Sequence, residues 1–179
     1  MMRLLQVLLF TFFLAYSSSA YASQTPCESG TALEPPTMQE QELASLVNQE
    51  RIQAGRQPLR LDARLSCLAR HYAQDMATRN FFSHYDPEGN SPFDRLHKKN
   101  ITYRAAAENL FKGWRDPEEE SMKIAHSFLM QSAGHRRNIL DSDFTVIGVG
   151  VVRTPEEWTY VVELFLLPSL ADARKGVIQ

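Results

Sequence analysis

Apolar and polar positions alternate with helical spacing through most of the chain and form strand-like runs near its end. The clearest stripe contains Leu65, Leu68, Tyr72 and Met76, whose spacing of three and four residues places them on one face of a helix. Asp62 precedes the stripe and can accept a hydrogen bond from the first free amides. The pattern therefore predicts a helix that begins just after Asp62.

Start and stop signals predict two further helices in the same region. Thr37 and Glu40 have the form of a capping box before a first helix, which Gly55 ends. Ser91, followed by a proline at the first helical position, opens a short helix that continues to about Lys99.

A fourth helix and two strands complete the predicted elements. The start signal recurs at Asp116, and the segment around Gly134 breaks the helix that follows. Two β-branched, apolar runs at 146–152 and 159–167 predict antiparallel strands joined by a turn. A single strand pair is too small to stand alone, so the chain is expected to form an α+β domain in layers.

The first 22 residues have the pattern of a secretory signal. A positive start at Arg3 precedes an apolar run of roughly 13 residues, which is short of the ~20 that a membrane-spanning helix needs. Small residues then lead to Ala22, where we expect cleavage. The mature protein is expected to be secreted or periplasmic, without a transmembrane segment.

Length and composition suit one domain. The chain has 179 residues, of which 44% are hydrophobic, and no segment is repeated or of low complexity. A linker rich in Ser, Gly, Thr and Pro is predicted at 23–36, the domain at 37–168 and a C-terminal tail at 169–179. The mature protein is expected to be a monomer.

Charge argues against a nucleic-acid partner. Loss of the signal removes one of the 19 basic residues and none of the 21 acidic ones, which leaves a formal charge of −3. A nucleic-acid-binding protein normally carries a basic stripe that neutralises phosphates. No such stripe is visible in this sequence.

Two cysteines survive signal removal. In an oxidising compartment Cys27 and Cys67 are expected to pair and to attach the N-terminal segment to the second helix. Lipidation of Cys27 and two free thiols are the alternatives.

Three polar side chains stand at breaks between apolar runs and are the candidate site. They are His84, which ends the segment FFSH, Glu108 in AENL, and His135 in AGHRRNIL. Two imidazoles and one carboxylate are a known ligand set for catalytic zinc, with water in the open position. In the alternative, Glu108 is a general acid or base and the two histidines orient it.

Other chemistries find little support in the sequence. No nucleophile elbow is visible, Cys67 lies in the apolar stripe of a helix, and no Gly-rich phosphate loop or CxxC pair is present. The only cofactor indicated is a divalent metal ion such as zinc.

Five ordered motifs together resemble one family. FFSHYDPEGNSPFDRL, AENL, SAGHRRNIL, DFTVIGVGVV and an aromatic-rich final strand are similar to the bacterial branch of the CAP superfamily, between about Thr37 and Pro168. That superfamily includes cysteine-rich secretory proteins, antigen 5 and plant pathogenesis-related proteins of group 1. The resemblance implies a three-layer α-β-α sandwich.

The resemblance also implies a central cleft lined by two histidines and two acidic residues, which holds zinc or another divalent ion in some members. His84, Glu108 and His135 match three of these positions. Gln131 stands where the second acidic residue is expected, and Ala107 replaces the usual Gly. Loss of one negative charge predicts modest metal affinity.

Two functions from different classes remain open. The first is a secreted binding domain whose cleft holds a metal ion and whose ligand is a lipid, peptidoglycan or a protein. The second is a peptidoglycan hydrolase with Glu108, His84 and His135 as catalytic residues. A two-carboxylate mechanism would need a further acid, for which Asp86 and Glu163 are candidates. One fold hosts many functions, so family resemblance does not choose between these two.

Overall fold

The structure is a computed structural model that describes residues 33–170. Its elements in chain order are α1 (Met38–Gln53), β1 (Arg60–Leu61), α2 (Ala63–Thr78), α3 (Pro92–Lys98), β2 (Tyr103–Trp114), α4 (Ser121–Gln131), α5 (Ala133–Leu140), β3 (Val146–Arg153) and β4 (Trp158–Pro168). The predicted signal peptide, most of the predicted linker and most of the predicted tail lie outside the described residues.

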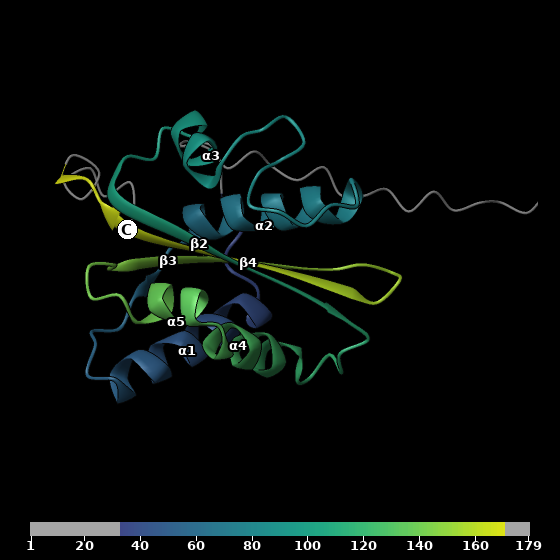
Figure 1. Ribbon diagram of the computed structural model, residues 1–179, viewed down its shortest axis with the longest axis horizontal. Coiled ribbons are helices and arrows are strands. Elements are labelled where there is room, and N and C mark those ends of the chain that lie inside the picture. The colour runs from purple at the N-terminus through teal and green to yellow at the C-terminus, as the bar shows by residue number, and fades with distance from the viewer. Residues whose placement is uncertain (1–32, 171–179) are drawn as a thin grey trace, which may run out of the picture.

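The elements form three layers (Figure 1). Helices α2 and α3 cover one face of the sheet, and α1, α4 and α5 cover the other. The expected α+β sandwich with an α-β-α arrangement is therefore confirmed.

The sheet has the strand order β1-β3-β4-β2. β1 pairs with β3 in parallel, whereas β3 and β2 each pair with β4 in the antiparallel sense. β2 is consequently an edge strand, and its residues Glu108 and Asn109 lie opposite Leu164 and Glu163 of β4.

Alternation along the strands divides the core into two clusters. Val161 and Phe165 of β4 pack with α1, α4 and α5, whereas Val162 and Leu164 pack with α2 and α3. Successive strand residues point to opposite faces, so one apolar run fills both cores. This explains why the final strands read as continuous apolar segments.

Three predicted helix starts are confirmed. The side chains and backbones of Thr37 and Glu40 form the reciprocal capping box of α1. Asp62 accepts a hydrogen bond from the amide of Leu65 at 2.8 Å, and Ser91 caps α3. Each cap satisfies amides that have no partner within the helix.

Four other elements differ from the predictions. β1 and β2 were not predicted, and β2 is the longest strand of the described residues. α4 begins at Ser121 rather than just after Asp116, because residues 118–120 form a turn first. The segment around Gly134 does break α4, but it also begins α5, which runs over the residues that follow the break.

Cys67 is buried in α2, at 5% exposure. Its expected partner, Cys27, lies outside the described residues, so the disulfide stays a prediction. Within residues 33–170, none of the helices combines the length and apolar character that a membrane span requires.

α2 lies directly on β3 because two glycines leave room for it. A Cβ placed on Gly148 would overlap Leu65, and one placed on Gly150 would overlap the backbone nitrogen of Arg70. Helix and strand backbones thus approach each other more closely than any side chain would allow.

We expect Gly150→Ala to lower the free energy of unfolding by about 2 kcal/mol or more, because backbone atoms of α2 would have to move. Gly134→Ala is the matched control. Gly134 lies in α5 with nothing within 4 Å of the added carbon, and its replacement should raise stability by up to about 1 kcal/mol. Urea denaturation of both variants tests the pair, and equal effects would contradict the close approach.

Candidate functional site

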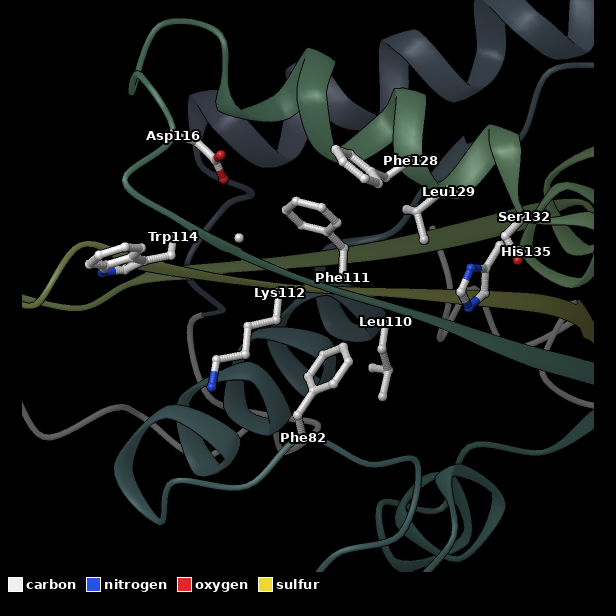
Figure 2. A pocket seen from close by; sticks show the side chains of 11 residues that line it. Phe82, Leu110, Phe111, Lys112, Trp114, Asp116, Phe128, Leu129, Ser132 and His135 are labelled. Atoms are coloured by element: carbon white, nitrogen blue, oxygen red, sulfur yellow. The ribbon is translucent and has the colours of Figure 1, made fainter.

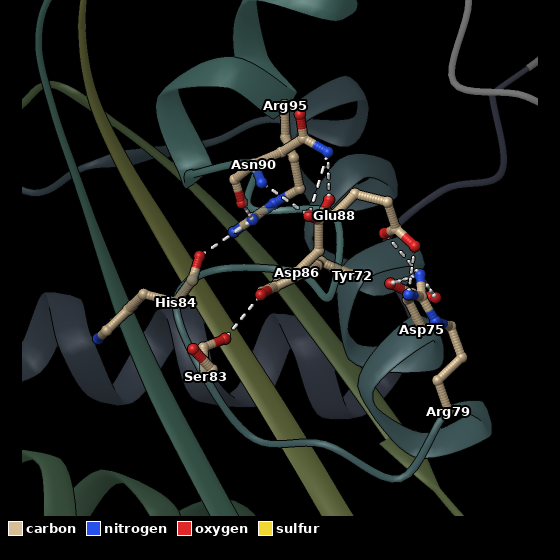
Figure 3. Close-up of polar contacts among 9 residues, drawn as sticks. All are labelled: Tyr72, Asp75, Arg79, Ser83, His84, Asp86, Glu88, Asn90 and Arg95. Carbon is tan, nitrogen blue, oxygen red and sulfur yellow. Dashed lines mark hydrogen bonds and ion pairs between the residues drawn. The ribbon is translucent and has the colours of Figure 1, made fainter.

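The loop between α2 and α3 presents His84 and is fastened at several points (Figure 3). The hydroxyl of Tyr72 donates to the carbonyl of Ser83 at 2.6 Å, and Arg95 donates to the carbonyl of His84 at 3.1 Å. The Arg95 guanidinium also lies over the Tyr72 ring, 3.3 Å from its centroid. Helices on both sides of the loop thereby hold the backbone of His84.

Asp86 closes the same loop. Its carboxylate accepts hydrogen bonds from the backbone and side-chain nitrogens of Asn90, at 2.7 to 3.0 Å. Asp86 is therefore engaged in the turn itself.

Glu108 of β2 binds two side chains at once. Its Oε1 lies 2.8 Å from Nδ1 of His84, and its Oε2 accepts a hydrogen bond from Arg95 at 2.7 Å. The Glu108 side chain is only 1% exposed, whereas that of His84 is 46% exposed. The carboxylate is thus a buried anchor that orients an accessible imidazole.

Asn109, the next residue along β2, points to the opposite face and binds α5. Its amide nitrogen donates to the carbonyl of His135 at 3.2 Å and to Glu163 at 2.9 Å. Its amide oxygen accepts from Asn138 at 2.9 Å. One buried amide therefore holds the helix that carries His135.

His135 is half-buried, and its ring faces the cleft from the α5 side. Burial lowers the pKa of His135 below the usual imidazole value, and an electrostatic contribution from His84 lowers it further. The two histidines come from opposite helical layers. The lowered pKa favours the neutral imidazole, the form whose free ring nitrogen could accept a proton or a metal ion.

Glu163 lies on β4 in the same sheet, directly opposite Asn109 of β2, and is completely buried. Its Oε2 has the bond from Asn109, but its Oε1 has no hydrogen-bond partner within the described residues. Burial raises the pKa of this carboxyl to about 7, and the hydrogen bond from Asn109 only partly offsets that effect. Glu163 therefore cannot contact a ligand directly, and it acts on the site only through Asn109.

Two cavities follow the open edge of β2. One, of about 450 Å³, lies beside Leu110–Trp114 and reaches His135 (Figure 2). The other, of about 340 Å³, lies beside Ala106–Glu108 and is lined by His84 and Asn138. The three candidate residues are thus divided between two cavities along one strand, with His135 at the first and with His84 and Glu108 at the second.

The structure brings His84 and Glu108 into direct contact, and it places His135 in the other helical layer, where its backbone carbonyl is bonded by Asn109. It does not gather the three as a ligand group: residues 33–170 contain no set of three or more His, Cys, Asp or Glu side chains that could hold a metal ion. The catalytic and metal-binding roles of these residues stay predictions.

Several residues of the site were not predicted. Arg95 lies in a short predicted helix, and nothing in its spacing marks it as part of the site. Asn109 and Asn138 are marked only by being close in sequence to Glu108 and His135. Gln131, at the position expected for a second acid, is exposed and donates to Ser127 on its own helix.

A three-layer sandwich with a His–Glu pair and a second histidine along its edge strand agrees with the CAP-type domain that the sequence resembles. The family model described as CAP, cysteine-rich secretory protein family, matches residues 44–165, and the chain belongs to this family.

Known relatives agree with that assignment. The chain is 42% identical over 120 residues to YkwD, an uncharacterized protein of Bacillus subtilis (strain 168), and the matched region covers 67% of this chain and 45% of YkwD. The chain therefore spans less than half the length of this curated relative.

Solved structures agree as well. An extracellular protein containing a SCP domain from Bacillus anthracis str. Ames has a TM-score of 0.62 and 27% identity, over 72% of this chain and 40% of that one. An outer surface protein from Borrelia burgdorferi has a TM-score of 0.67 and 20% identity, over 77% of this chain and 98% of that one, and shows the fold alone.

We expect Glu163→Gln to stabilise the protein more at about pH 8 than at about pH 5. The pKa of Glu163 is raised from 4.5 to about 7 in the folded state, so the folded protein holds this proton more tightly than the unfolded chain does. The free energy of unfolding therefore falls as the pH rises from about 4.5 through about 7. Glutamine stays neutral, so the free energy of unfolding of the variant should exceed that of the wild type by on the order of 3 kcal/mol at the higher pH. Denaturation at both pH values measures this, and a pH-independent difference would contradict the buried titration.

Proposed function

We propose that the chain is an exported CAP domain that binds an extracellular ligand in the cleft along β2, with a divalent metal ion held weakly by His84 and His135. The observation that carries the proposal is the state of Glu108. Both of its oxygens already accept a hydrogen bond, from His84 and from Arg95.

That arrangement favours an orienting role for Glu108 over a catalytic one. A general base needs an oxygen within hydrogen-bond reach of the water or hydroxyl that it deprotonates. Glu108 is 1% exposed and has both oxygens engaged. Its geometry resembles that of a carboxylate that fixes the ring of a binding histidine.

In this proposal, two imidazoles would hold the divalent ion. His84 uses Nδ1 toward Glu108, which leaves Nε2 as the ring nitrogen able to bind an ion, and His135 supplies a neutral imidazole from the other layer. Zinc accepts such nitrogen ligands and would act as a Lewis acid toward a bound group. With two protein ligands and the fixed cation of Arg95 beside Glu108, affinity should be modest.

A two-carboxylate hydrolase finds less support. Glu163 is completely buried, and the carboxylate of Asp86 is occupied by Asn90. Neither is available as the second acid that most glycosidases use.

Export is supported by the predicted signal and by the relatives. The B. anthracis neighbour is an extracellular protein, and a neighbour from Staphylococcus aureus is a cysteine-rich secretory protein with 26% identity. An exported bacterial domain would meet cell-surface polymers, lipids and proteins, which are the ligands proposed here.

Zinc affinity of the purified protein should fall about tenfold or more when pH is lowered from about 7.5 to about 5.5, because the imidazoles must be neutral to bind. His84→Ala and His135→Ala should each weaken binding, and Glu108→Gln should do so by roughly tenfold to a hundredfold through loss of orientation. His97→Ala, at an exposed position of α3, is the control. Calorimetry that finds unchanged affinity at low pH or in the double histidine variant would rule out this metal site.

Incubation with isolated peptidoglycan tests the binding role against hydrolysis. We expect no soluble fragments by mass spectrometry, with or without zinc. Fragments released by the wild type and absent with Glu108→Gln would instead establish a hydrolase that uses Glu108, and would identify the bond that is cut.

A further inference from the structure

β2 has a free edge along the site. It pairs with β4 on one side, and no strand of residues 33–170 pairs with it on the other. The backbone amides and carbonyls that face outward along such an edge are ready to pair with another extended chain.

The larger cavity contacts this edge from both faces. It is lined by the five consecutive residues Leu110–Trp114. Because alternate side chains of a strand point to opposite faces, one groove can contact all five only if it opens at the strand edge. Figure 2 shows this arrangement, with Phe111 directed toward α4 and with Leu110 and Lys112 directed to the other side.

Each helical layer adds an exposed aromatic ring to the groove. Phe128 of α4 is 60% exposed and stacks 5.8 Å from Phe111, and Phe82, from the loop after α2, is 46% exposed. Exposed apolar side chains that gather in one patch commonly mark a binding surface. The two rings thus line the groove from opposite sides of β2.

Asp116 supplies a buried carboxylate oxygen that has no hydrogen-bond donor in the described part of the chain, although Arg153 donates to the backbone carbonyl of the same residue at 2.9 Å. Asp116 lines the same groove, and the oxygen without a donor is its Oδ2. This oxygen lies so close to Gly113 that a Cβ there would overlap it, which places the carboxylate directly against the strand. A buried carboxylate oxygen calls for a donor, and charge complementarity favours a cationic one.

We propose that the edge of β2 from Leu110 to Trp114 binds an extended polypeptide segment as an additional strand, with apolar side chains against Phe82 and Phe128 and a cationic group against Asp116. This inference rests on the proposed ligand-binding function and names its ligand class. A polypeptide matches the site because its amides and carbonyls pair with those of the edge in register. A lipid chain would leave these backbone groups unpaired.

Selection from a displayed library of random peptides of about ten residues tests the proposal. Selected peptides should alternate apolar residues and carry a Lys, an Arg or a free amino terminus. The decisive measurement is an N-methyl scan of one selected peptide by fluorescence anisotropy. Methylation at alternate positions, where the amide faces β2, should weaken binding at least about tenfold, and methylation at the intervening positions should have little effect.

Variants of the protein locate the site. Asp116→Asn should weaken binding roughly tenfold to a hundredfold, whereas Glu119→Gln, a nearby exposed acid that does not line this groove, should not. Circular dichroism checks that both variants fold, and the N-methyl scan does not depend on them.

The outcomes separate this inference from the proposed function. Strand addition is overturned if no peptide is selected. It is also overturned if the affinity of a selected peptide changes neither with N-methylation at alternate positions nor with Asp116→Asn. If the wild type still binds zinc through His84 and His135 in that case, the proposed function stands without it. If zinc binding is also absent, both fail.

Discussion

The site depends on the alternation of side chains along one uncovered strand. Glu108 and Asn109 are neighbours in β2, so they point to opposite faces of the sheet. Glu108 reaches the layer that holds His84 and Arg95, and Asn109 reaches the layer that holds His135. One strand thereby positions histidines from two separate layers, and no further strand of residues 33–170 lies beyond it.

The buried carboxylates of this fold differ in the groups that stabilise their negative charge. Glu40 is paired with Arg70 at 2.6 Å, and Glu108 is paired with Arg95, so each has a permanent cation beside it. Glu163 has only the amide of Asn109. A neutral donor stabilises a buried negative charge less than a guanidinium does. That contrast explains why the pKa of Glu163 is raised into the physiological range.

Much of the fold could be predicted from local patterns. The helix starts at Thr37, Asp62 and Ser91 depend on short-range hydrogen bonds, and the residues that make them are close together in sequence. β2 could not be predicted in the same way. Its first half is rich in alanine, which has low strand propensity, and it is stabilised by a long-range register with β4.

The candidate residues could likewise be chosen from sequence, but their relationships could not. His84, Glu108 and His135 stand out as polar groups at breaks between apolar runs. Arg95 does not, because an arginine in a short helix is usually exposed, and only the folded chain brings it to Glu108. Its presence changes the chemistry of the carboxylate from a free group to an engaged one.

The helices on the two faces of the sheet are held in place by different means. α2 rests on bare strand backbone at Gly148 and Gly150 and buries residues along its whole length. α5 buries only Ile139; the amides of Asn109 and Asn138 tie it to β2, and the buried Arg51 of α1 donates to the carbonyl of Ile139 at 2.7 Å. The two sides of the site are therefore sensitive to different substitutions: the α2 side to added volume on the strand, and the α5 side to the loss of a hydrogen-bond donor.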